Sequence, residues 1–185
     1  INVAEGADIT LHGEFGELRP QPPGGWSDLP LADPSTLVDG IFLPQSTLWN
    51  QDSIWWDTTL ENSADNWIEI DLGMTYDLIG FIVQADDNDT YMLEYWNGSA
   101  WVSAWTIPVV GGWGDQTRPN PLDNDEMYEL GSPITTDRLR FTGIMPSDQY
   151  YSVTEIQAFA AIPEPGTLAL LGIGLIAMAL VRRRV

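Results

Sequence analysis

Apolar and polar positions alternate along much of the chain. The clearest case is the segment 67–72 (WIEIDL), in which apolar side chains occupy every second position and acidic ones lie between them. A period of two is typical of a β-strand with one buried face and one solvated face. The segment 78–83 is more continuously apolar and predicts a central strand.

A hairpin is predicted around Asn97-Gly98, because the apolar segments 91–96 and 101–107 flank a pair of residues suited to a tight turn. Further strands are expected at 9–14, 127–130, 138–144 and 153–160. The polar stretch 113–125 predicts a long loop, and the proline-rich segment 19–35 predicts irregular chain. Many short strands without a three-turn helix indicate an all-β, jelly-roll β-sandwich of about eight strands.

The pattern changes at the C-terminal end, where an apolar run from Leu168 to Val181 is followed by Arg182, Arg183 and Arg184. Such a run predicts a transmembrane helix over 167–185 with a cytoplasmic arginine tail. At about 1.5 Å per residue it is shorter than a hydrocarbon core of about 30 Å, so it spans only with snorkelling or local thinning. The predicted organisation is an exported sandwich at 1–161, a linker at 162–166 and this helix.

Pro163, Glu164 and Pro165, the glycine-containing apolar run and the terminal arginines together resemble the PEP-CTERM sorting signal. The resemblance implies export from a Gram-negative cell that makes exopolysaccharide, recognition by an exosortase, and cleavage near the Pro-Glu-Pro triplet. The domain would then be periplasmic or on the cell surface. An ordinary single-pass tail anchor is the alternative.

Composition limits the partners. The chain has 27 acidic and 7 basic residues and a net charge of −20, so it repels polyanions and is not expected to bind nucleic acid. It contains no cysteine, so an exported domain must be held by its core rather than by disulfides. The first residue is Ile1, which predicts that the numbering begins after a removed signal peptide.

A series of short segments in fixed order resembles a discoidin domain, the coagulation-factor type C or galactose-binding-like fold. The segments are 37–40 (LVDG), 46–49 (STLW), 67–73, the turn at 97–98, 138–141 and 153–159. The resemblance covers roughly residues 30–160. Members used as carbohydrate-binding modules often hold a structural Ca²⁺, which by position implies Asp39, Thr47 and Glu155 as ligands here. Carboxylates, hydroxyls and carbonyls suit calcium.

Nine tryptophans supply aromatic faces that can stack on sugar rings. In the discoidin fold the ligand-binding residues lie on loops at one end of the sandwich. The residues expected on such loops, and hence the candidates for glycan binding, are Trp55, Trp56, Trp113, Arg118, Tyr150 and Tyr151. Burial against the proline-rich segment is the alternative for these aromatics, while Trp49, Trp67, Trp96, Trp101 and Trp105 are expected in the core or in cross-strand pairs.

Catalysis is not expected. His12 is the only histidine, cysteine and lysine are absent, and no serine lies in a Gly-x-Ser-x-Gly pattern. The acidic run 86–89 is expected to be a solvated turn, with cation binding by its alternate oxygens as the alternative. Two functions remain: an exported module that binds a neutral glycan, and a structural subunit whose sandwich docks on partner membrane or surface proteins.

Overall fold

Eight antiparallel strands and one short 3-10 helix form the part of the chain that the computed structural model describes, namely residues 1–63, 65–120, 126–145 and 148–161. The elements are β1 (Asp8–His12), η1 (Pro34–Val38), β2 (Ile54–Asp57), β3 (Trp67–Asp86), β4 (Thr90–Trp96), β5 (Trp101–Ile107), β6 (Asp115–Arg118), β7 (Tyr128–Met145) and β8 (Tyr150–Ala160).

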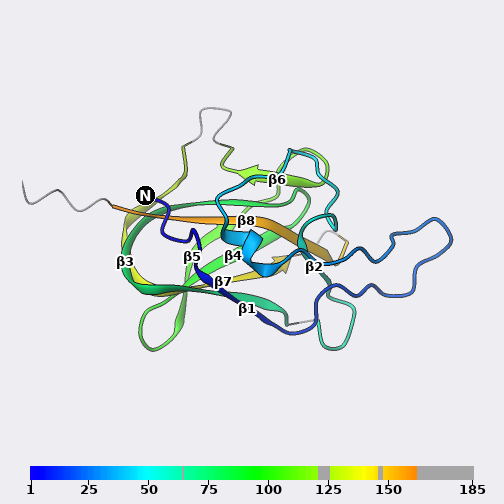
Figure 1. Ribbon diagram of the computed structural model, residues 1–185, viewed down its shortest axis with the longest axis horizontal. Helices are drawn as coiled ribbons and strands as arrows, with labels where there is room; N and C mark the ends of the chain where they lie inside the picture. The colour runs from blue at the N-terminus through cyan, green and yellow to red at the C-terminus, as the bar shows by residue number, and fades with distance from the viewer. Residues whose placement is uncertain (64, 121–125, 146–147, 162–185) are drawn as a thin grey trace, which may run out of the picture.

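The strands form two layers because β3 and β7 are long and bend. The first half of β3 pairs with β1 and β7, and β7 continues to β4 and β5. The second half of β3 pairs with β6 and β8, and β8 pairs with β2. Figure 1 shows β3 curving at the left of the view. The bend includes Gly73, whose φ of 75° is in the left-handed region that favours glycine.

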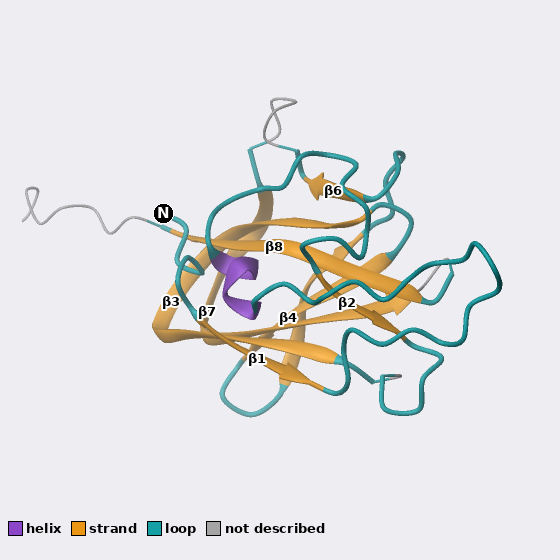
Figure 2. Ribbon diagram, turned by 45° about the vertical axis from the view of Figure 1, so that its right-hand side comes forward, coloured by secondary structure: helices purple, strands orange, loops and turns teal. Residues whose placement is uncertain are grey.

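Apolar side chains from both layers meet between the two halves of β3. Ile68 and Ile70 from its first half and Phe81 and Val83 from its second half are fully buried. Figure 2 shows η1 between β8 and β1; it contacts both strands and buries Leu37 in the main core. The second half of β3 and nearly all of β8 are buried.

The predicted antiparallel β-sandwich of about eight strands is confirmed for the described residues. The hairpin at Asn97-Gly98 is also confirmed, with Gly98 at φ 93° and the Asn97 side chain accepting a hydrogen bond from the Ser99 amide. The segments 67–72 and 78–83, predicted as two strands, are parts of one bent strand, β3. In the same way, the predicted strands 127–130 and 138–144 are parts of β7.

Two expectations about loops were wrong. The predicted loop 113–125 contains β6, and Trp55 and Trp56, which were expected on a loop, lie in the unpredicted strand β2. No helix within the described ranges is long and apolar enough to cross a membrane. The predicted transmembrane helix at 167–185 and the linker at 162–166 lie outside those ranges.

Candidate functional site

A cleft of about 850 Å³ opens between β5 and β6, and we call it the β5–β6 cleft. Its walls come from β5 and the segment 108–111 on one side and from β6 with Pro119 and Asn120 on the other; Gln45 and Tyr128 complete it. The described residues that line it include Trp105, amides and hydroxyls but neither aspartate nor glutamate. Among the described residues, the lining is therefore free of carboxylates in a chain that carries −20 overall.

Trp105 and Tyr128 form the aromatic part of the cleft. Their rings stack with centroids 4.5 Å apart and planes at 7°. Trp105 lies on β5 and is 6% exposed, whereas Tyr128 begins β7 and is half-buried. Stacking restricts both rings, so Tyr128 offers a fixed apolar surface to a ligand.

The polar wall is held in place by reciprocal hydrogen bonds. The Gln45 side-chain amide donates to the Thr117 hydroxyl at 2.7 Å, and the Thr117 backbone amide donates to the Gln45 side-chain oxygen, Oε1, at 3.0 Å. The Gln116 amide donates to the backbone oxygen of Trp113 at 2.9 Å. Trp113, 56% exposed, thus stands beside the cleft on the loop before β6.

Arg118 lies at the base of the cleft and is only 3% exposed. Its guanidinium donates to the backbone oxygen of Asp86 and lies over the Tyr91 ring, 5.7 Å from the centroid. Among the described residues, its Nε and Nη1 have no hydrogen-bond partner. Burial lowers the pKa of Arg118.

Buried carboxyl groups surround Arg118. Asp115 accepts a hydrogen bond from the Ser152 hydroxyl at 2.7 Å through Oδ1, and its Oδ2 has no partner within the described ranges. Burial raises the pKa of Asp115 well above its usual range. Burial and the charges of Asp87 and Asp148 raise the pKa of Asp86 to about 7. Burial therefore favours the protonated form of both carboxyl groups.

Four of the aromatic residues predicted on loops lie on strands instead. Trp55 and Trp56 are in β2, Tyr150 and Tyr151 are in β8, and none is more than 9% exposed. Trp56 stacks on Tyr151 in the main core, whereas Trp55 and Tyr150 pack around Trp49. Their expected position on ligand-binding loops was wrong.

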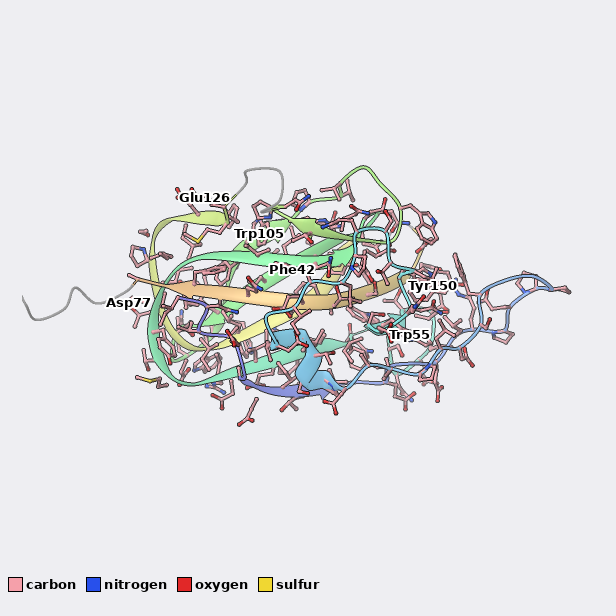
Figure 3. All side chains as sticks on the ribbon, turned by 45° about the horizontal axis from the view of Figure 1, so that its top comes forward. Phe42, Trp55, Asp77, Trp105, Glu126 and Tyr150 are labelled. Carbon is pink, nitrogen blue, oxygen red and sulfur yellow. The ribbon has the colours of Figure 1, made fainter. Side chains whose placement is uncertain are left out.

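For the cluster around Trp49, the alternative prediction of burial against the proline-rich segment is confirmed. Leu18 and Leu31 pack against Trp49, Trp55 and Tyr150. Figure 3 shows Trp55 and Tyr150 together toward the right of the view and Trp105 apart from them. Of the predicted ligand residues, only Trp113 and Arg118 therefore belong to the cleft region.

Sequence reasoning missed Tyr128 and Gln45, and it assigned Trp105 to packing alone. Trp105 and Tyr128 are far apart in sequence and meet only because β5 and the start of β7 border the same cleft. No local pattern indicates that meeting.

Half-buried tryptophans also cover the outer face of the β1–β3–β7–β4–β5 layer, as predicted for cross-strand pairs. Trp96 and Trp101 are opposite each other in β4 and β5, with ring centroids 5.5 Å apart. His12 stacks on Trp67 at 3.6 Å, and its Nε2 lies 3.3 Å from Glu69. These rings contact one another, so we treat this face as packing.

The predicted calcium ligands are brought together in part. Glu155 Oε1 accepts a hydrogen bond from the Gly40 amide at 3.1 Å, and Oε2 is buried without a partner among the described residues. Burial and the charge of Asp39 raise the pKa of Glu155 to about 8. Thr47 packs elsewhere, since its hydroxyl donates to Pro44 and it forms a β-bridge with Asp115.

No group of three or more acidic or histidine side chains within the described ranges is arranged to hold a metal ion. A calcium ion at Glu155 would need backbone oxygens as well as carboxylates, which is ordinary for this cation. The unpartnered Oε2 of Glu155, with Asp39 nearby, is suited to bind a cation. Thr47 packs elsewhere and would not be a ligand.

Solved structures with a similar fold include carbohydrate-binding modules and a lectin domain. Chitosan-binding module 1 from a chitosanase/glucanase of Paenibacillus sp. IK-5 has a TM-score of 0.53 and 13% identity over 86% of this chain and 99% of its own. A fucose-binding module of Streptococcus pneumoniae has a TM-score of 0.53 and 11% identity over 88% and 99%. The lectin domain of lectinolysin, solved with Lewis B antigen, has a TM-score of 0.52 and 12% identity over 88% and 98%.

The described sandwich therefore has the discoidin-like fold, also called galactose-binding-like. The chain also carries a PEP-CTERM protein-sorting motif at residues 161–184, and both predicted resemblances are confirmed. The motif includes Pro163, Glu164, Pro165 and the arginines Arg182 to Arg184, which lie outside the described residues. Comparison with curated protein sequences gives no match.

Proposed function

We propose that this chain is an exported, non-catalytic module that binds a neutral glycan in the β5–β6 cleft. The observation that carries the proposal is the stacked Trp105–Tyr128 pair in a lining without carboxylates among the described residues. Aromatic faces stack on sugar rings, and the amides and hydroxyls around them suit sugar hydroxyl groups. The binding of chitosan, fucose and Lewis B antigen by proteins of similar fold supports a glycan as the ligand.

Replacing Tyr128 with alanine is expected to weaken glycan binding about fivefold, because the lost stacking contributes about 1 kcal/mol. Affinity electrophoresis of the full chain in gels containing neutral galactan, glucan or galactomannan measures this effect. The matched control is Trp26→Ala, since Trp26 is 40% exposed on the proline-rich segment away from the cleft. Equal retention of Tyr128→Ala and the unmodified chain, or no retention in any gel, would contradict the proposal.

We further propose that a calcium ion bound by Asp39 and Glu155, with neighbouring backbone oxygens, stabilises the fold. Ionised Glu155 is costly when buried alone, so a cation beside it should raise the melting temperature. Scanning calorimetry at pH 7.5 with added Ca²⁺ and then with chelator tests the site. A drop in Tm of several degrees in chelator is expected, with no such drop in Glu155→Gln. Identical curves with calcium and with chelator for the unmodified chain would exclude the ion.

The tail is proposed to direct the chain to the envelope of a Gram-negative cell and to anchor it there, with its arginines on the cytoplasmic side, until an exosortase cleaves it near Pro163. The sorting motif supports this proposal. Intact-mass analysis of the chain extracted from native membranes is expected to show an end near Pro163. A chain ending at Val185 together with copurifying proteins would favour the alternative of a structural subunit that keeps its tail.

A further inference from the structure

A second cavity of about 510 Å³ adjoins the β5–β6 cleft. The loop 40–45 forms most of it, and Thr117 and Asn120 complete it. Gln45, Thr117 and Asn120 line both cavities, so the two meet along this polar row. We treat the two adjoining cavities as one surface groove.

The second cavity continues the chemistry of the first. Phe42 supplies a half-buried aromatic ring, and Ile41 is 64% exposed at its edge. Figure 3 labels one aromatic residue from each cavity: Phe42 from the second cavity and Trp105 from the β5–β6 cleft. None of the described residues in the second lining is charged. Apolar surfaces at both ends of a polar middle match a row of sugar rings, which have apolar faces and hydroxyl edges.

The groove is fixed by bonds to the interior. Buried Gln84 of β3 donates to the Leu43 backbone oxygen and accepts from the Leu43 amide, both at 2.8 Å, and it donates to the Thr117 hydroxyl at 3.1 Å. These contacts join the loop 40–45 to β3 and β6. A preformed groove loses little conformational freedom on binding, which favours affinity.

We infer that this groove takes an internal stretch of a linear, neutral polysaccharide of several sugar units, in preference to a single terminal sugar. This inference rests on the proposed function and specifies its ligand class. Together the two cavities are larger than the ~1,000 Å³ at the upper end of pockets for drug-sized ligands, and one sugar ring is smaller than such a ligand. A ligand that covers both aromatic ends must therefore be a chain.

Isothermal titration of the full chain with gluco-, galacto- and N-acetylglucosamine oligomers of one to six units tests the inference. For the series that binds, affinity is expected to rise at least about tenfold between one and four units and then level off, because longer chains fill both parts. Affinity that does not change with length would overturn the inference while leaving the proposed function in place. No binding by any oligomer would count against both.

Variants separate the two parts of the groove. Phe42→Ala is expected to weaken the longest oligomer about fivefold or more and to leave the monosaccharide unchanged, whereas Tyr128→Ala weakens both. Since Phe42 is half-buried, Ile41→Ser at the exposed edge provides a second variant with the same expected direction. Met74→Ala is the control, because Met74 is 59% exposed and lines neither cavity. Unchanged binding of the longest oligomer by both Phe42→Ala and Ile41→Ser would also overturn the inference.

Discussion

Replacing Arg118 with methionine is expected to destabilise the fold by about 3 kcal/mol near pH 8. Methionine fills similar space but removes the cation from a region that holds the buried carboxyls of Asp86 and Asp115. Ionised carboxylates without a nearby cation are costly in the interior. Urea unfolding followed by tryptophan fluorescence gives the free energy of unfolding.

The matched control is Arg138→Met. Arg138 is 35% exposed in its side chain and lies 3.6 Å from Glu69, so its loss should cost less than about 1 kcal/mol. The effect of Arg118→Met should also shrink at pH 5, where the buried carboxyls are protonated. Equal losses for the two arginines, or an Arg118 effect that is the same at both pH values, would contradict this account.

The melting temperature of the calcium-free chain is expected to fall as the pH rises from about 5 to 8. The folded chain holds protons on Asp86 up to about pH 7 and on Glu155 up to about pH 8, whereas the unfolded chain releases them near their ordinary values. Stability is therefore lost as each folded-state pKa is passed. At about 1.4 kcal/mol per pKa unit, Asp86 alone contributes on the order of 4 kcal/mol.

Circular-dichroism melts in chelator at pH 5, 6.5 and 8 measure this dependence. Asp86→Asn should flatten the curve, because its amide does not ionise, while the control Asp28→Asn on the exposed proline-rich segment should leave it unchanged. A melting temperature that is constant or rises over this range in the unmodified chain would show that the buried carboxyls are not protonated in the fold. Below pH 4 the slope should reverse, since hydrogen bonds from Arg19 and Thr59 outweigh burial and hold the pKa of Asp57 below its usual value.

Strands with a strong local pattern were predictable from the sequence. The segment 67–72 alternates because one face is buried and the other is not, and the hairpin at Asn97-Gly98 depends on its own turn. By contrast, β6 reads Asp-Gln-Thr-Arg and has no apolar pattern. It is a strand because it pairs with residues 83–86 of β3, a contact that no local segment encodes.

The candidate site was harder to predict for a related reason. Trp55 and Trp56 are neighbours in the sequence, and both were expected to be exposed on a loop. In the structure they point to opposite sides of β2, where each packs in a different apolar cluster. The cover over Trp55 comes from the segment around Leu18 and Leu31, which has no regular structure of its own. Two-sided burial of this kind depends on distant chain, as does the meeting of Trp105 with Tyr128.

The way β8 ends has a mechanical consequence. The last described residues follow directly from β8, which lies between β2 and β3 in the sheet. At the end of β8, the Ile1 ammonium donates to the Ala160 backbone oxygen at 3.1 Å. Tension applied to the tail therefore acts along the axis of β8. Its ladder hydrogen bonds run across that axis, so they are loaded in shear and share the force instead of opening one after another. A domain held by this end should resist pulling better than one held by an edge strand.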